Sequence, residues 1–448
     1  MTITDAIAVG YMEDTDAFAA VALAYSWLMA TSLIGFGMAS VLDTLASQAH
    51  GYENSERLAA LLLRSAFAVS LTAVPIGLLW WNTEGSLLAL RQDPRIAALA
   101  GSYVRLQLPG LWPFLMYQCL TKWLQAQEIV SPSMIVGLAA NALNVFTNWA
   151  LIFWMDMGFV GAPIATSISR TFLFLGLLGY CWWVGLLKPF GLARTWERCL
   201  TRAGLREYGV LAVSAVGMLC FEAWGFEFTT MLAGLLGNVS LAAHEVAYNI
   251  LDVGFAFAVG TSVAASTGVG TLIGRGDAAG ARRYSVVVIV ASVVATTIAG
   301  CGLATVRHRI GRAFSSDPAV LEALKPLLPV LISFLSLDSL QTTTGGALRG
   351  AGRPGTGAIV QFSGFYLVGL PLGAHLAFRG GMGVAGLWYG LAVGLACVSL
   401  ALIVALSRTD WEARAREAVA RCAADAIADV AGGGGAAAGT AAGIVSAL

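Results

Sequence analysis

Long apolar runs, separated by short polar stretches, make up most of this chain. Eleven of them hold about 20 or more mostly apolar residues, the length that crosses the hydrocarbon core of a bilayer as an α-helix. They cover residues 17–44, 58–81, 96–124, 134–155, 160–187, 208–236, 240–273, 284–306, 320–348, 357–378 and 384–407. Turn-forming residues separate several of them, at Gly51–Glu56, Gln92–Pro94, Ser131–Pro132 and Gly350–Gly355. The pattern predicts an all-α polytopic membrane protein.

The segment before these runs, residues 2–12, is apolar but too short to span a bilayer. It ends where an acidic stretch, Glu13–Asp16, would close a first span. A helix from Met1 to this stretch rises only about 20 Å, so the charged amino group would lie at membrane depth, which is costly. We therefore expect a truncated first helix that lacks on the order of 15–30 upstream residues. A short re-entrant segment is the alternative.

Composition supports the membrane assignment and narrows the function. Hydrophobic residues form 58% of the chain, charged residues 12%, and the mean hydropathy is +0.76. Soluble domains carry about 25% charged residues. The formal net charge is zero, so nothing indicates a nucleic-acid partner. The seven cysteines are scattered without a CxxC pair, and the sequence has no HExxH and no GxSxG motif. We expect no metal, no cofactor and no catalytic residues, and hence no enzyme.

Basic residues fall unevenly on the two sides of the predicted spans. With the 187–208 connection placed in the cytoplasm, the cytoplasmic loops and the C-terminal segment hold 15 basic residues, and the opposite loops hold 6. This bias obeys the positive-inside rule, although the cluster at 307–312 opposes it. It predicts a cytoplasmic C-terminus. The protein is expected to be a multi-pass protein of the plasma membrane or of a vacuolar-type membrane.

Three short matches within the chain recur at nearly one spacing. They join residues 37–51 with 260–274, 124–136 with 348–360, and 158–161 with 383–386, at offsets of 223, 224 and 225 residues. Such an offset indicates an internal duplication of the kind found in secondary transporters. It predicts an amino-terminal helical lobe over 1–187, a cytoplasmic connection over 188–207, a carboxy-terminal helical lobe over 208–408, and a cytoplasmic polar helix with a low-complexity tail over 409–448.

Lone acids interrupt two of the apolar runs. Glu222 and Glu227 have no lysine, arginine or histidine beside them within residues 217–236. An ionised carboxylate at the bilayer centre costs about 3 kcal/mol or more, so such an acid usually faces a water-filled cavity or binds a proton. Asp338 is similar and is followed by Gln341 and three threonines. Acids that are alternately neutral and charged suit a proton-coupled carrier; buried acids bonded to neighbouring helices are the alternative.

Several motifs, taken in their order, resemble the multidrug and toxic compound extrusion (MATE) family, especially its eukaryotic branch. They are Gly37–Ala49, Leu124–Gln127 with Pro132, Met218–Trp224, Ala264–Thr267, and Gly345–Gly350 with Tyr366–Gly373. The resemblance covers residues 2 to 408. It implies two pseudo-symmetric six-helix lobes, the first helix truncated here, around a cavity that opens alternately to each side. It also implies export driven by an inward gradient of protons or sodium ions.

Carried over by position, the resemblance implies roles for individual residues. Glu222 matches the essential acid of the family's seventh helix, Glu227 a second acid of some eukaryotic members, and Asp338 an acid of the tenth helix. All three are therefore expected to take part in proton coupling. Asp43 resembles the aspartate of an aspartate–threonine pair near the cytoplasmic mouth, and with Gln48 it is expected to have a gating or structural role.

Polar and aromatic residues near the acids are candidates for the substrate site. We expect Trp224, Tyr248, Asn249 and Gln341 to bind substrate, Trp224 through its aromatic face. For each of them, a packing role or a hydrogen bond within the lobe is the alternative. Polar residues also occur in the amino-terminal half. Asn141, Asn144 and Asn148 share one helix face, as either glue between helices or cavity lining, and Arg170 lies deep enough to pair with an acid.

Together these features predict a secondary active antiporter that exports small cationic or neutral organic compounds in exchange for protons. Its expected partners are the small-molecule substrate, protons or sodium ions, and the lipid bilayer, and it is expected to be a monomer. A lipid-linked-sugar flippase of the same superfamily is an alternative, although its cavity would be cationic. A membrane-embedded enzyme and a channel are alternatives from other classes. Substrate-dependent proton flux in reconstituted vesicles distinguishes an antiporter from these last two.

Overall fold

A computed structural model describes residues 4–5, 15–187, 201–311 and 317–432 of the chain. Throughout these ranges the regular structure is helical, and no strand occurs in them. The chain divides into two compact units. Unit 1 comprises Met1–Leu42 and Ala59–Val216, and unit 2 comprises Asp43–Leu58 and Gly217–Leu448.

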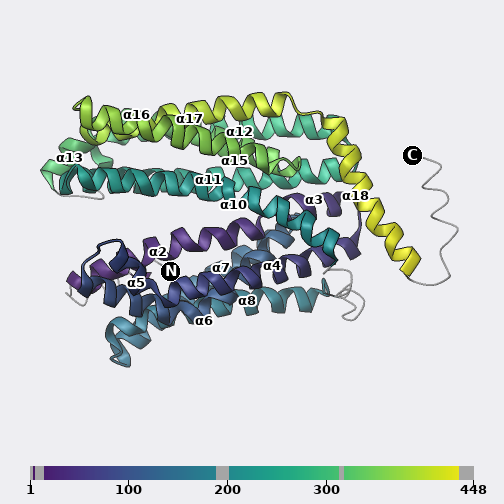
Figure 1. Cartoon of the computed structure of the whole chain (residues 1–448), viewed down its shortest axis with the longest axis horizontal. Helices are drawn as coiled ribbons and strands as arrows, with labels where there is room; N and C mark the ends of the chain where they lie inside the picture. Colours follow the sequence, from purple (N-terminus) through teal and green to yellow (C-terminus); the bar gives the residue numbers. More distant parts are fainter. Residues whose placement is uncertain (1–3, 6–14, 188–200, 312–316, 433–448) are drawn as a thin grey trace. The chain divides into compact units, whose positions relative to one another are not determined.

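Unit 1 consists of long helices joined by short turns (Figure 1). Its elements are α2 (Thr15–Ala39), most of α4 (Ser55–Trp81), α5 (Thr83–Ala89), α6 (Pro94–Gln125), α7 (Ser131–Trp149), η1 (Ala150–Trp154), η2 (Gly158–Val160), α8 (Gly161–Val184) and the first part of α10 (Arg202–Leu235). α6 packs against both α2 and α8, and α7 packs against α8. The predicted turn at Gln92–Pro94 has a clear local cause. The Asp93 carboxylate accepts hydrogen bonds from the backbone N–H groups of Arg95 and Ile96 at 2.9 and 3.2 Å and so caps α6.

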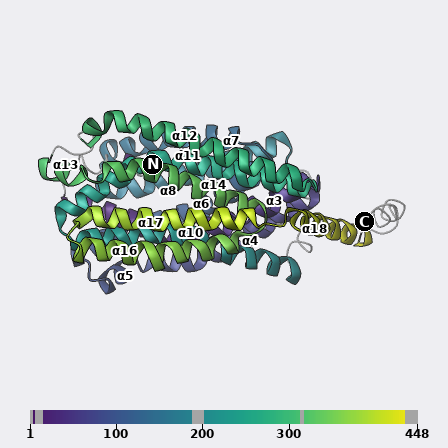
Figure 2. The same ribbon diagram turned by 90° about the horizontal axis from the view of Figure 1, so that it is seen from above.

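Unit 2 has the same character, and its long helices run alongside one another (Figures 1 and 2). Its elements are α3 (Leu42–Gly51), the rest of α10, α11 (Asn238–Gly274), α12 (Ala278–Ile310), α13 (Pro318–Leu324), α14 (Leu328–Gly350), α15 (Pro354–Phe362), η4 (Ser363–Gly369), α16 (Leu370–Ala374), η5 (His375–Arg379), α17 (Gly383–Ser407) and α18 (Trp411–Gly432). Helix α14 lies at the centre, because it contacts α11, α12 and α17.

The predicted apolar runs are all largely helical, and two of them, 17–44 and 320–348, each contain a short break between two helices. Among the described residues, nine helices are long and apolar enough to cross a membrane, and the pair α13–α14, bent by 54°, makes a tenth if it counts as one span. Helix α6 is not among them although it has 32 residues. It carries Arg105, Gln107, Lys122 and other polar side chains, which lower its hydropathy. The prediction of an all-α polytopic membrane protein is confirmed.

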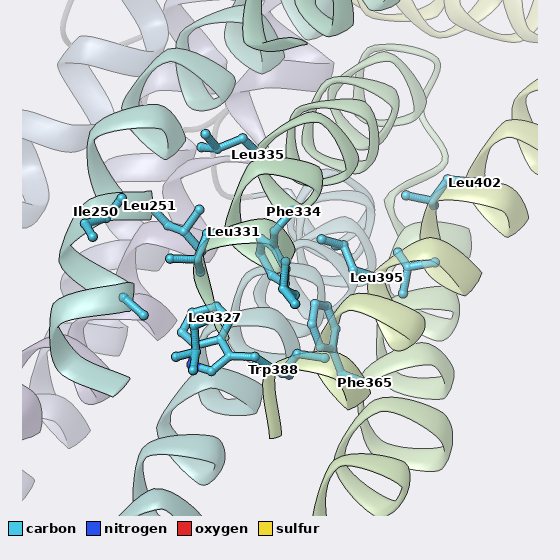
Figure 3. Packing of buried hydrophobic residues seen from close by; sticks show 14 of the residues in the cluster. Ile250, Leu251, Leu327, Leu331, Phe334, Leu335, Phe365, Trp388, Leu395 and Leu402 are labelled. Atoms are coloured by element: carbon cyan, nitrogen blue, oxygen red, sulfur yellow. The ribbon is translucent and has the colours of Figure 1, made fainter. Parts of the chain in front are cut away.

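A continuous apolar core holds unit 2 together. Leu331 and Phe334 of α14 pack against Trp388 and Leu395 of α17, with Phe365 of η4 beside them (Figure 3). The rings of Phe334 and Trp388 meet edge to face at 5.6 Å between centroids. Burying such side chains stabilises a fold by about 1.5–3 kcal/mol each in water; in a bilayer, close packing has to supply more of the gain.

Helices α11 and α14 approach each other more closely than ordinary side chains allow. A Cβ atom at Gly346 would overlap the carbonyl oxygen of Ser262, and one at Gly350 would overlap that of Ser266. Glycines spaced four residues apart present a flat face to a neighbouring helix, which is a common way to pack helices in membranes. This contact fixes α14, which carries Asp338 and Gln341, against α11.

The span from α15 to η5 is not a uniform α-helix. Its residues 363–369 and 375–379 form π-helical turns. Such turns are rare and occur often at functional sites. The first of them begins directly after Gln361 and Phe362, the last two residues of α15.

Some sequence predictions fall wholly or partly outside the described residues. These are the first segment except residues 4–5, residues 188–200 of the connection between the lobes, and the tail from 433 onward. Within the region 409–448, α18 occupies the stretch for which a polar helix is predicted. Residues 43–58, which the sequence assigns to the amino-terminal lobe, group with unit 2.

Candidate functional site

Four side chains from three helices of unit 2 form a buried hydrogen-bonded centre, here called the acid centre: Glu222 of α10, Asp338 and Gln341 of α14, and Gln361 of α15. The Gln341 Nε2 donates to Glu222 Oε1 at 2.6 Å and lies 3.5 Å from Asp338 Oδ1. The Gln361 Nε2 donates to Glu222 Oε2 at 3.0 Å and to Gln341 Oε1 at 3.2 Å. Both oxygens of Glu222 therefore accept an amide N–H, and one amide group connects the two acids.

The acid centre is largely closed to solvent. Gln341 and Gln361 are 0% and 1% exposed, Asp338 is 7% exposed, and Glu222 is half-buried. A polar group in such a place must find partners within the protein. Carboxylates are acceptors only, and carboxamides are their natural neutral donors. The arrangement can therefore hold either carboxyl group in its ionised form without an arginine or lysine in contact.

The cation that acts on this centre, Arg349, lies two turns beyond Gln341 on α14. Its guanidinium donates to Ser262 Oγ at 2.7 Å and contacts Met218 Sδ at 3.6 Å. Met218 is one turn before Glu222 on α10, and the charges of Arg349 and Glu222 interact. Arg349 therefore acts electrostatically on Glu222 from the level of Met218, one helical turn away.

The same arginine leads to the predicted gating residues. Asp43 Oδ2 lies 3.9 Å from Arg349 Nε, and Thr44 Oγ1 donates to the Arg349 carbonyl at 2.6 Å. Gln48 Nε2 donates to the carbonyl of Gly350 at 3.0 Å, and its Oε1 accepts from Arg421 Nη2 of α18 at 3.0 Å. Helix α3 is thus bonded to the end of α14 and to α18. A gating or structural role for Asp43 and Gln48 stays a prediction.

Glu227 lies apart from the acid centre. It is exposed, and the charge that acts on it belongs to Glu245 of α11. Tyr248, also exposed, meets Phe226 edge to face at 5.8 Å. Asn249 donates to the backbone carbonyl of Glu245 at 2.7 Å. These side chains form an acidic and aromatic surface on α10 and α11 that differs from the buried centre.

Of the predicted site residues, then, the structure brings Glu222, Asp338 and Gln341 together. Trp224, two residues from Glu222, is half-buried on α10. Sequence reasoning missed Gln361. Its only local signal is a lone glutamine within the apolar run 357–378, and nothing near it in sequence points to Glu222.

A second acid in a polar network occurs in unit 1, and sequence reasoning missed it as well. Asp5, 2% exposed, accepts hydrogen bonds from Tyr103 Oη at 3.0 Å, Asn148 Nδ2 at 2.8 Å and Thr166 Oγ1. Asn144 Nδ2 also donates to Thr166 Oγ1 at 3.3 Å. The asparagine face at 141–148 could have predicted a buried acceptor. Asp5 itself gives no signal in the sequence, because its segment is too short to count as a span.

Arg170 belongs to the same unit, one turn after Thr166 on α8. Its guanidinium carbon lies 4.7 Å from the ring centroid of Phe114 and 6.0 Å from that of Trp80. Its charge interacts with Asp5 and Tyr103. All three residues of the asparagine face bond within the protein: Asn144 and Asn148 donate to Thr166 and Asp5 of the polar network, and Asn141 donates to the Gly137 carbonyl of its own helix.

Comparison with known proteins assigns this architecture to a family. The MatE family model matches residues 1–150 and 214–374. Multidrug and toxin extrusion protein 2 of Mus musculus is 36% identical over 406 residues, which cover 90% of this chain and 70% of that protein. Multidrug and toxin extrusion protein 1 of Xenopus tropicalis is 35% identical over 407 residues, again 90% and 70%.

Solved structures agree. The eukaryotic MATE transporter AtDTX14 superposes with a TM-score of 0.85 and 27% identity, covering 94% of each chain. A MATE protein in its bent conformation superposes with a TM-score of 0.79 over 94% of this chain and 92% of that one. At 16% identity, this second likeness shows the fold alone. This chain belongs to the MatE family of multidrug and toxin extrusion transporters.

Proposed function

We propose that this chain is a secondary active antiporter that exports small cationic or neutral organic compounds in exchange for protons by alternating access. Glu222 is its main coupling acid, and Asp338 is the partner acid. Glu227 contributes to proton coupling from the acidic and aromatic surface of α10 and α11. The observation that carries the proposal is the amide of Gln341, which lies within reach of both buried carboxyl groups.

The chemistry of this pair favours proton binding. Two carboxylates close together at low dielectric repel each other strongly, so a centre of this kind gains from holding a proton. The amide groups can donate to whichever acid is ionised. A proton is therefore a ligand that the acid centre can accept and release by exchanging the hydrogen bonds of its amide groups.

The substrate class follows from the surface of α10 and α11. Exposed acids at Glu227 and Glu245, with the exposed ring of Tyr248, attract cations and planar molecules. The names of the relatives support the same class, since they are multidrug and toxin extrusion proteins. We further propose that Trp224, Tyr248, Asn249 and Gln341 contact substrate, that the protein acts as a monomer, and that its C-terminus is cytoplasmic.

The proposal is tested in proteoliposomes with an imposed pH gradient and the planar cation ethidium as probe. Glu222→Gln keeps the size of the side chain and removes its ionisation. We expect proton-driven ethidium transport to fall about 100-fold, equivalent to about 2.7 kcal/mol in the barrier, with the protein still folded. Glu322→Gln, at an exposed acid of α13, is the matched control and should transport normally. Wild-type rates for Glu222→Gln would contradict the assignment of the coupling acid.

The same vesicles test the coupling ion. A pH gradient without sodium should drive ethidium transport, and ethidium should in turn drive proton movement. A sodium gradient at constant pH should not. If sodium alone drives transport at the full rate, the proposed ion is wrong. If neither gradient does, the antiporter proposal fails, and a flippase, a channel or an enzyme becomes the better explanation.

A further inference from the structure

The amide of Gln361 is only half satisfied. Its Nε2 donates to Glu222 Oε2 and to Gln341 Oε1. Its Oε1 is buried and has no hydrogen-bond partner among the residues that the structure describes. The side chain as a whole is 1% exposed. A buried acceptor without a donor is unfavourable, so its position within a centre of titratable groups calls for a physical reason.

The two protonation states of Glu222 supply one. An ionised carboxylate only accepts hydrogen bonds, and here Gln341 and Gln361 each donate one to it. A protonated carboxyl group carries an O–H and needs an acceptor. The Gln361 Oε1 belongs to the same planar amide that now contacts Glu222 Oε2. Rotating this amide by half a turn replaces its N–H donor with its carbonyl acceptor.

We propose that Gln361 is a positioning residue that follows the protonation state of Glu222 by reversing its side-chain amide. When a proton binds to Glu222 Oε2, the hydrogen bond from Gln361 Nε2 breaks and a hydrogen bond from the carboxyl O–H to Gln361 Oε1 forms. When the proton leaves, the exchange runs backward. This inference rests on the proposed function, because it takes Glu222 as the group that binds the transported proton.

The reversal reaches Asp338 through Gln341. In the orientation seen here, Gln361 Nε2 also donates to Gln341 Oε1, and this bond is lost when the amide turns. Gln341 Nε2 has two hydrogens but three acceptors nearby: Glu222, Asp338 and Thr342 at 2.6, 3.5 and 3.0 Å. It can serve two of them at once. Freeing Gln341 therefore lets its amide shift from Glu222 toward Asp338, which links the two acids without a direct contact.

The place of Gln361 in its helix gives the reversal a mechanical effect. It is the second-last residue of α15, and the π-helical turns of η4 follow at Ser363. π turns are irregular points within a helix, where its direction changes readily. Phe221, next to Glu222, packs against Phe362 and Tyr366 at 5.1 and 6.0 Å between ring centroids. A change at Gln361 therefore acts where α10 and the irregular span touch.

Other charged or titratable groups act on Glu222, and a substitution at Gln361 does not remove them. Helix α14 contributes Asp338 and Arg349, both of which interact with it electrostatically. From η4, the hydroxyl of Tyr366 interacts with Cys220 of α10. None of them belongs to α15, so a substitution at Gln361 removes the amide and leaves the charges around Glu222 unchanged.

The test is Gln361→Leu in the proteoliposome assay, with transport measured as a function of pH. A hydrogen bond to an ionised group is about twice as strong as one between neutral groups. Removing the amide therefore disfavours ionised Glu222 more than the protonated form. We expect the pH of half-maximal ethidium-driven proton flux to rise by roughly one unit. Ser363→Ala, two residues on, is the matched control, because among the described residues its hydroxyl donates to the backbone carbonyl of Ile359, one turn earlier in the same span, and not to the acid centre.

An infrared measurement provides a readout that a packing role would not move. The C=O band of protonated Glu222 is identified by its loss in Glu222→Gln. In Gln361→Leu this band should move to higher wavenumber, because the carboxyl O–H loses its acceptor. If Gln361→Leu does not fold, Gln361→Asn replaces it. Its amide is one methylene too short to reach Glu222, so it should give both shifts.

The outcomes separate this inference from the proposed function. An unchanged pH profile and an unchanged band in Gln361→Leu, together with loss of transport in Glu222→Gln, overturn the role of Gln361 alone. Normal proton-coupled transport in Glu222→Gln overturns the proposed function itself. A shifted profile with an unshifted band also overturns the amide reversal, because Gln361 would then act on Glu222 without bonding to its proton.

Discussion

At the scale of single residues, the two buried acids of unit 2 should not be equivalent. Among the described residues, Glu222 accepts two amide N–H groups, whereas Asp338 has one within reach, at the longer distance of 3.5 Å. Asp338→Asn keeps an oxygen for Gln341 and removes ionisation. We expect it to slow ethidium-driven proton flux about tenfold, equivalent to about 1.4 kcal/mol and less than the effect of Glu222→Gln. Initial rates in proteoliposomes measure it, and a larger loss than for Glu222→Gln would reverse the assigned roles.

The acid of unit 1 permits a residue-scale prediction about stability. Asp5→Ala removes the acceptor that the buried donors of Tyr103, Asn148 and Thr166 share. An unsatisfied buried polar group costs about 1–3 kcal/mol, so we expect a clearly lower unfolding temperature in detergent. Asp5→Asn retains one oxygen acceptor and should lower it less. Equal unfolding temperatures for wild type and Asp5→Ala would show that this network contributes nothing to stability.

The sequence identifies some of the site residues, but it does not predict their hydrogen-bond partners. Glu222 and Asp338 stand out because an ionisable group in an apolar run needs a special reason. Gln361 does not, because a glutamine is much less costly there and its partners lie on two other helices. Asp5 was hidden by the shortness of its segment. Partners across a helix bundle depend on rotation and depth, which hydropathy does not encode.

At the scale of helices, the contact between α11 and α14 depends on small residues. Gly346→Ala places a Cβ against the Ser262 carbonyl, and overpacking of this kind costs about 1–3 kcal/mol. We expect a lower unfolding temperature in detergent and slower transport, because α14 carries Asp338. Gly302→Ala on α12 is the matched control, since a Cβ there has nothing within 4 Å. It should be neutral or slightly stabilising.

Element boundaries followed the sequence closely, and the exceptions have physical causes. Turn-forming residues predict the turns at Gly51–Glu56 and Gly350–Gly355. The sequence does not predict the bend of 54° between α13 and α14, because the run 320–348 reads as one apolar stretch. It does not predict the π turns of η4 and η5 either, because a change in the backbone hydrogen-bond register leaves no periodic signature in so short a segment.

At the scale of the whole molecule, charge should select the cargo. The substrate surface proposed for α10 and α11 carries exposed acids, and like charges repel strongly where water is scarce. We expect a planar aromatic trisulfonate to be exported at least tenfold more slowly than ethidium under the same pH gradient, equivalent to about 1.4 kcal/mol or more. Uptake of the two probes into the same vesicles makes the comparison. Equal rates would count against a substrate class that excludes polyanions.

The duplication inferred from the sequence predicts two similar helical halves. The compact units show in addition that a segment of the first half groups with the second. Residues 43–58 belong with unit 2 because Thr44 and Gln48 bond to the end of α14, and Arg57 Nη1 donates to the Arg421 carbonyl of α18 at 2.8 Å. No repeat at an offset of about 224 residues could predict this. Such bonds depend on side chains that differ between the two halves.

The π turns of η4 also have a consequence for any scan of this span with reactive probes. Exposed large side chains recur at Ile359, Phe362 and Leu367, three and then five residues apart. Within the π turns the backbone bonds from residue i to i+5, so the stripe that faces outward skips a residue there. Cysteines placed along 357–378 should therefore react with a lipid-soluble maleimide in a pattern whose phase slips after Phe362. An analysis that assumes one helical period throughout would assign Tyr366 to the outward face in place of Leu367.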